Sequence, residues 1–109
     1  MTIDKERVRA LNDLLRRYHR GGTIMLTAGI QALDERTIRG VDTAIAAFDA
    51  FTPDNDPYGE HDFGSVTVAG ETVFFKIDCY DLALLNHSPD PADPAVTRRV
   101  MTIMLAEEY

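Results

Sequence analysis

The chain has 109 residues, 45% apolar and 27% charged, with a formal net charge of −7 at pH 7. This length suits a single domain over residues 1–109 with one core, and the composition argues against a disordered chain. The acidic balance disfavours general binding to nucleic acid, because neutralising phosphates needs a basic surface. The lone Cys79 excludes an internal disulfide and a multi-cysteine zinc site.

No apolar run approaches the ~20 residues that a membrane span needs, and the charged segment 1–7 lacks the apolar stretch of a signal peptide. We therefore expect a cytoplasmic protein with no membrane contact. The charge is unevenly spread, because residues 1–20 carry six basic side chains against three acidic ones. The remaining residues are strongly acidic, which leaves room for a basic partner or a cation.

Two helices and a short strand are predicted in the first half of the chain. Apolar residues recur at helical spacing over residues 4–18, and Gly21-Gly22 ends this helix. Residues 23–27 alternate in polarity and predict a strand, which Ala28-Gly29 breaks. A second helix over residues 34–50 begins with a suitable N-cap, Asp34. The apolar stripes are Val8, Leu11, Leu14, Leu15 and Tyr18 in the first helix, and Ile38, Val41, Ile45 and Phe48 in the second.

A hairpin follows, with strands over residues 63–68 and 72–80 and a tight turn at residues 69–71. The second strand alternates strictly, so successive side chains point to opposite faces. We predict that one set of four belongs to the core and that the other set points away from it. The core set is Val73, Phe75, Ile77 and Cys79, and the other set is Phe74, Lys76, Asp78 and Tyr80.

The last part of the chain predicts a loop and then a helix. Residues 81–93 are rich in proline and aspartate, and Asp93 with Pro94 has the character of a helix start. The predicted order is α-β-α-β-β-α in an α+β domain. We expect a three-stranded, mostly antiparallel sheet with helices packed on one face. The apolar stripe of the last helix is Val96, Val100, Ile103 and Met104, flanked by Met101 and Leu105.

The acidic loop over residues 53–64 partly imitates a calcium loop. Counted from Asp54, ligand or glycine positions of such a loop are matched at Asp56, Gly59 and Asp62. Tyr58 occupies a ligand position, Ser65 replaces the bidentate glutamate, and a strand follows where a helix should. We therefore predict no metal site and no cofactor, and the aspartates are interpreted as turn residues. Asp54, Asp56, Tyr58, Lys76 and Asp81 remain candidate binding residues.

Five residues are the candidates for catalysis: Glu60, His61, Asp62, Asp78 and Tyr80. His61 lies between two acids, a setting that suits a general base, although no evident nucleophile or oxyanion hole accompanies it. Pairing the hairpin symmetrically places Asp62 opposite Asp78, within about one residue of register. We expect these side chains to form one concave polar site. The alternatives are a solvated histidine and a Lys76–Asp78 surface pair.

Two further ionic contacts are predicted. Glu107 and Glu108 end the predicted last helix, where acids oppose the helix dipole, so we expect Arg16, Arg17 or Arg20 to meet them, either within the chain or across a dimer. Arg98 or Arg99 is expected to reach Asp90 or Asp93.

Long segments of the chain resemble a family of small bacterial proteins known only as a domain of unknown function, common in alphaproteobacteria and their plasmids. The resemblance rests on Asn55–Gly64, Lys76–Asp81, Ser88–Pro94 and Thr102–Tyr109, and it covers nearly the whole chain. Cys79 departs from the aromatic residue that relatives carry, which disfavours a cysteine nucleophile. The resemblance implies no activity.

The leading hypothesis is an acidic, non-enzymatic interaction module that binds a protein partner or a second copy of itself. The resemblance gives this hypothesis a specific form, an accessory protein of mobile DNA. A surface that mimics nucleic acid is one version, but the chain keeps too much apolar pattern for an all-acidic mimic. The alternative is a small hydrolase or divalent-metal-dependent enzyme that uses Glu60, His61, Asp62 and Asp78.

Overall fold

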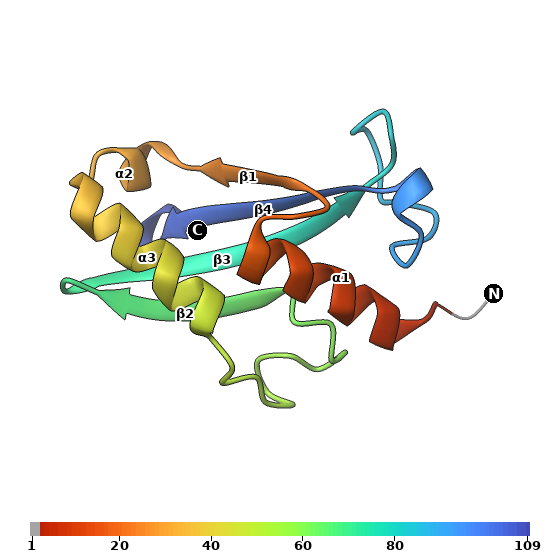
Figure 1. The fold of residues 1–109 in the computed structure, drawn as a ribbon, viewed down its shortest axis with the longest axis horizontal. Coiled ribbons are helices and arrows are strands. Elements are labelled where there is room, and N and C mark those ends of the chain that lie inside the picture. Colours follow the sequence, from red (N-terminus) through yellow and green to blue (C-terminus); the bar gives the residue numbers. More distant parts are fainter. Residues whose placement is uncertain (1–2) are drawn as a thin grey trace.

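The computed structural model describes residues 3–109, and the first two residues of the charged N-terminal segment lie outside this range. It is an α+β domain with one layer of helices over one mixed sheet (Figure 1). In chain order the elements are α1 (Lys5–Tyr18), β1 (Thr23–Leu26), α2 (Ala28–Gln31), α3 (Glu35–Ala47), β2 (Phe63–Val68), β3 (Glu71–Tyr80), the 3-10 turn η1 (Pro94–Val96), β4 (Arg98–Leu105) and the 3-10 turn η2 (Ala106–Glu108).

Both long helices begin at aspartate caps. Asp4 accepts the backbone N–H of Arg7 at 3.1 Å, and Asp34 accepts that of Thr37 at 2.7 Å, which satisfies donors that a helix start leaves unpaired. α3 ends at Ala47, three residues before the predicted end, because Phe48 adopts an extended backbone. β1 ends at Leu26, and Ala28 and Gly29, predicted to break this strand, begin the short helix α2.

The sheet has four strands in the order β1-β4-β3-β2, so the prediction of three strands was wrong. β4 runs parallel to β1 and antiparallel to β3, and β2 pairs with β3 as the predicted hairpin. The hairpin turns at Ala69 and Gly70, which both have positive φ as a two-residue hairpin turn of this kind requires. Within residues 3–109, no helix has the length and apolar character to cross a membrane.

The predicted last helix is a strand. Asp93 and Pro94 do start a helical turn, but it ends after Val96. The following residues form β4. Its Met101 and Ile103 are buried on the face of the sheet that the helices cover. A central strand that is apolar on both faces loses the alternation that identifies a strand. Its apolar positions therefore also matched helical spacing.

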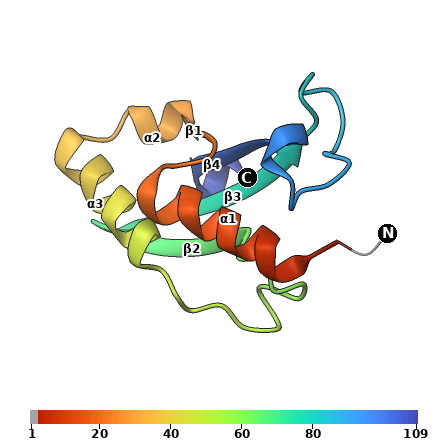
Figure 2. The same cartoon turned by 45° about the vertical axis from the view of Figure 1, so that its right-hand side comes forward.

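The helices lie on the same side of the sheet and bury its inner face (Figures 1 and 2). The predicted core set of β3 is confirmed for Val73, Phe75 and Ile77, which are 0%, 0% and 4% exposed, and Cys79 is half-buried. Lys76 and Asp78 point away from the helices, as predicted. In α1 the stripe residues Val8 and Leu15 are buried, whereas Tyr18, the last residue of the helix, is 66% exposed.

The predicted contact between the α1 arginines and the C-terminal acids is not formed within the chain over residues 3–109, and its alternative form, across a dimer, stays a prediction. Glu108 accepts hydrogen bonds from the Thr27 hydroxyl at 2.6 Å and from the backbone of Gly29 and Leu105 at 3.0 and 2.9 Å. These bonds lower the pKa of Glu108, the Thr27 bond contributing most. Glu108 lies in η2, directly after β4, and β4 pairs with β1, so Glu108 meets the β1–α2 connection rather than α1.

Arg98 and Arg99 also bond to other groups than the predicted aspartates. Arg98 donates to the carbonyl of Leu82 at 3.0 Å. Arg99 is buried and donates to the side chain of Asn12 at 2.6 Å and to the carbonyl of Pro91. Both residues belong to β4, whose alternation sends them to opposite faces of the sheet.

Candidate functional site

The acidic loop between α3 and β2 folds around Asp56. Its carboxylate accepts the backbone N–H groups of Glu60 at 3.0 Å and of His61 at 3.2 Å, and the residue is only 7% exposed. The loop bends at Gly59 and His61, which both have positive φ. Asp56 therefore shapes the loop, in the manner expected of turn aspartates, and Asp54 beside it is exposed.

His61 points toward α1. Its Nδ1 lies 2.9 Å from Asp13 Oδ1, and its ring stacks on Phe51 with 3.9 Å between ring centroids. Its Nε2 lies 3.9 Å from the carboxylate of Asp56. Its contacts are thus with Asp13, Phe51 and Asp56, and His61 does not line the cleft that Asp78 lines.

Asp13 joins this histidine to a buried arginine. Burial alone would raise the pKa of Asp13, but hydrogen bonds from Arg16 and His61 outweigh burial and lower it. Arg16 is fully buried and lies 2.8 Å from the Asp13 carboxylate. Its guanidinium also donates to three carbonyls that end α3, at 2.8–3.2 Å. The network His61–Asp13–Arg16 thus fixes the loop and the end of α3 to α1, which is a structural role.

Three of the predicted acidic residues line one small cleft where β3 extends beyond β2, although the carboxylate of Asp78 pairs with Lys76 on the face of the sheet that points away from the helices. Glu60, Asp62 and Asp78 line this cavity of about 120 Å³. The register places Phe63 opposite Lys76, and the carbonyl of Asp62 accepts the N–H of Ile77 at 2.8 Å. Asp62 therefore lies one residue from Asp78 in register. The rest of the lining is Val8, Asn12, Ile77, Cys79, His87 and Pro91.

The surroundings of the cleft favour protonated carboxyls. Burial raises the pKa of Glu60, and the charges of Asp62 and Asp56 raise it further. Burial likewise raises the pKa of Asp62, with a smaller contribution from Asp78. Raised carboxyl pKa values in a concave site are typical of general acids and of sites that attract cations. Among residues 3–109, however, no group of three or more acidic, histidine or cysteine side chains has an arrangement that could hold a metal ion.

Asp62→Asn should raise the free energy of unfolding near neutral pH. The folded pKa of Asp62 is raised, so stability decreases as pH rises from the unfolded pKa through the folded one. An asparagine removes that cost. In acid, where Asp62 is protonated in both states, the gain should vanish. Urea denaturation at both pH values tests this, with Asp54→Asn in the exposed part of the loop as control. A loss of stability at neutral pH would show that the ionised carboxylate supports the fold.

The other candidate residues are dispersed. Lys76 and Tyr80 lie on the face of the sheet that points away from the helices, and Lys76 Nζ is 3.5 Å from Asp78 Oδ2. Tyr58 is 67% exposed in the acidic loop, with Lys5 Nζ 5.9 Å from its ring centroid. Asp81 accepts the N–H of Leu85 at 3.0 Å, a bond that lowers the pKa of Asp81 and shapes its loop.

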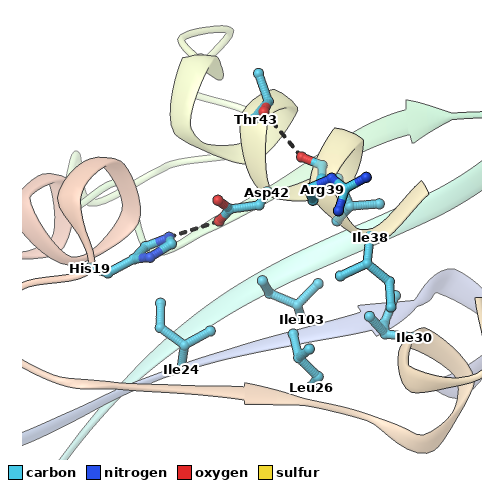
Figure 3. A pocket seen from close by; sticks show the side chains of 10 residues that line it. His19, Ile24, Leu26, Ile30, Ile38, Arg39, Asp42, Thr43 and Ile103 are labelled. Carbon is cyan, nitrogen blue, oxygen red and sulfur yellow. Dashed lines mark hydrogen bonds and ion pairs between the residues drawn. The ribbon is translucent and has the colours of Figure 1, made fainter. Parts of the chain in front are cut away.

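A larger pocket, which was not predicted from the sequence, lies between α3 and β1. Its volume is about 530 Å³, and Figure 3 shows aliphatic side chains from both elements, from α2 and from β4 pointing into it. At the rim His19 Nε2 lies 2.7 Å from Asp42 Oδ1. The apolar stripes of 23–27 and of the second helix were visible in the sequence. The space left between them depends on α3 packing mainly over β2, which local pattern does not reveal.

Comparison with known proteins gives a family. A family model described as "Protein of unknown function (DUF3768)" matches residues 26–108. The chain belongs to this family. No match is found among curated proteins or among solved structures. The DUF3768 match includes the three carboxylates of the cleft and most of the pocket between α3 and β1, while α1 with Asp13 and Arg16 precedes the matched residues.

Proposed function

We propose that this DUF3768 protein is a non-enzymatic interaction module that pairs with a second copy of itself through the outer face of its sheet. The outer face is the side opposite the helices. It consists of alternate strand residues: Phe63, Ser65 and Thr67 of β2, Thr72, Phe74, Lys76, Asp78 and Tyr80 of β3, Arg98, Val100, Thr102 and Met104 of β4, and Thr23 and Met25 of β1. Among the described residues, none of the helices α1, α2 and α3 packs on this face (Figure 2), and Tyr109, which follows η2, packs on Phe63 and Phe74.

The charge of the outer face supports this proposal. The chain has 18 acidic residues, yet Asp78 is the one acid among the described strand positions of this face. Its charge is balanced by Lys76 at 3.5 Å, and Arg98 adds one basic group. A face nearly free of net charge on a strongly acidic protein is suited to contact with another copy, because like charges at the contact would repel.

Apolar side chains on the outer face support it as well. Phe63, Phe74 and Tyr109 form an aromatic cluster with centroid distances of 5.3–5.7 Å, and Tyr109 is 71% exposed. Met25 on the edge strand is 55% exposed. Aromatic and methionine side chains are enriched in protein interfaces relative to the remaining surface. This apolar and aromatic face is the observation that carries the proposal.

The size of the face predicts a weak dimer. The four strands contain 28 residues, and at about 3.3 Å per residue and about 4.8 Å between strands the face measures roughly 440 Å² per copy. Two copies together approach the lower limit of specific interfaces, about 1,000 Å². Sheets that pack face to face are an ordinary arrangement in proteins. We therefore expect dissociation at micromolar concentrations.

Met25→Glu should abolish this dimer. The wild-type chain should show a concentration-dependent shift from monomer to dimer in sedimentation velocity, and added salt should favour the dimer by screening repulsion between the acidic copies. Ala10→Glu, which adds the same charge at an exposed position of α1, should behave as wild type. A wild-type chain that stays monomeric up to millimolar concentration would refute the proposal, as would equal effects of the two variants.

The specific form of the proposal, an accessory protein of mobile DNA acting in the cytoplasm, rests on the family resemblance. A second candidate function rests on the cleft, where raised pKa values of Glu60 and Asp62 suit acid–base chemistry. Thermal unfolding with a panel of divalent cations separates the two candidates. A cation that stabilises the wild type but not Asp78→Asn would favour the metal-dependent enzyme.

A further inference from the structure

The pocket between α3 and β1 has the size and lining of a small-molecule site. Its volume of about 530 Å³ falls within the range of known ligand pockets, about 300–1,000 Å³. Six aliphatic side chains form its walls, from four different elements (Figure 3): Ile24, Leu26, Ile30, Ile38, Val41 and Ile103. Since Ile30, Val41 and Ile103 are also core residues at 0–2% exposure, the floor of the pocket is held rigidly.

The residues that line the pocket favour an aliphatic ligand. Among the described residues that line the pocket, none is phenylalanine, tyrosine or tryptophan, so the site offers no phenyl or indole face on which a planar ring would stack. Branched aliphatic side chains instead provide an apolar surface for a flexible hydrocarbon chain. Such a chain would gain about fourfold in affinity for each methylene that it buries.

The polar residues at the rim of the pocket favour a ligand with a negatively charged end group. His19 Nε2 and Asp42 Oδ1 lie 2.7 Å apart, so these two rim groups already have each other as hydrogen-bond partners. Arg39 lies at the same rim and forms an exposed ion pair with Glu35 at 3.9 Å; this distance is beyond hydrogen-bond range, so the guanidinium N–H groups can still donate to a ligand. Arginine is suited to bidentate recognition of a carboxylate. In a chain of net charge −7, a cationic group at the mouth of this apolar pocket is a specific feature.

We propose that this pocket binds a medium-chain aliphatic carboxylic acid, with the hydrocarbon chain among the isoleucines and the carboxylate at Arg39. The site is on the helical side of the sheet, opposite the outer face, so the inference does not depend on dimer formation. The pocket is formed within one chain, and its polar lining residues are His19, Arg39, Asp42 and Thr43. A free small molecule therefore fits it better than a segment of a second copy.

Isothermal titration calorimetry with hexanoate, octanoate and decanoate, below the concentrations at which they form micelles, tests the proposal. Affinity should rise about fifteenfold for each added pair of methylenes. Leu26→Trp, which fills the pocket with an apolar side chain, should weaken decanoate binding at least tenfold. Arg39→Gln should weaken decanoate but not the neutral decanol, whereas Arg36→Gln, an exposed arginine of α3 outside the pocket, should change neither.

A measurement on the wild type keeps the proposal testable if Leu26→Trp fails to fold. Decanoate should shift the methyl resonances of Ile24, Ile30 and Ile38, and leave that of Ile77, which lines the acidic cleft, unchanged. Affinity that does not depend on chain length, or equal shifts at Ile77, would overturn the proposal. Equal binding of decanol and decanoate with no effect of Arg39→Gln would overturn the assignment of an anionic ligand.

Discussion

Replacing Arg16 with alanine should cost about 3–5 kcal/mol in the free energy of unfolding, the range for removing one partner of a buried ion pair. The side chain is fully buried and bonds to Asp13 and to the carbonyls of Ile45, Ala46 and Phe48. Without the guanidinium, the carbonyls at the end of α3 lose their hydrogen-bond donor in a place that water reaches poorly. Asp13 also loses its positively charged partner. Urea denaturation monitored by circular dichroism measures the loss.

The neighbouring arginine supplies the control for this prediction. Arg17 is exposed on the same turn of α1, so Arg17→Ala should change stability by no more than about 0.5 kcal/mol. Arg16→Lys should remain strongly destabilised, because an ammonium cannot reproduce the forked donor geometry. Equal, small effects of the alanine variants at positions 16 and 17 would contradict the role assigned to Arg16.

Phe75→Ala should cost about 3–5 kcal/mol, as expected for deletion of a fully buried aromatic side chain. Phe75 is 0% exposed in the middle of β3, and its ring contacts Phe48 edge-on at 5.5 Å between centroids. It also packs so closely on Gly64 of β2 that a Cβ at that position would overlap the ring. Truncation therefore opens a cavity between the hairpin and α3. Chemical denaturation measures the loss.

Lys76→Ala is the matched control, because its side chain is 44% exposed and points to the opposite face of the same strand. It should cost far less than Phe75→Ala, since an exposed pair with Asp78 contributes only about 0–1 kcal/mol. If Lys76→Ala proved the more damaging change, the inner and outer faces of β3 would have been assigned the wrong way round.

The hairpin and both long helices could be predicted because their signals are local. Strict alternation in β3 identified the buried set, and Asp34 marked the start of α3. β4 could not be predicted this way, because its two faces are both apolar: Met104 is 7% exposed on one, and Met101 and Ile103 are 0% and 2% exposed on the other. Its partner β1 lies far away in sequence, so nothing local distinguished strand from helix.

The candidate site was predictable in part for the same reason. Hairpin register follows from a short turn, and it brought Asp62 beside Asp78 to within one residue. The position of His61 depends on Asp13, which is 48 residues away. In the sequence, the polar α1 residues Asn12 and Arg16 do not differ from polar residues on an exposed helix face. Their burial results from tertiary packing. Side-chain partners at such separations cannot be deduced from pattern alone.

The methionine methyl groups offer the most direct test of the proposal that the outer face of the sheet is an interface between copies. Met25 and Met104 lie on that face, whereas Met101 is fully buried on the other side of β4. On dilution from millimolar to low micromolar concentration, the methyl resonances of Met25 and Met104 should shift together along one binding curve while Met101 stays constant. Resonances of Met25 and Met104 that do not move over this range would contradict the proposal.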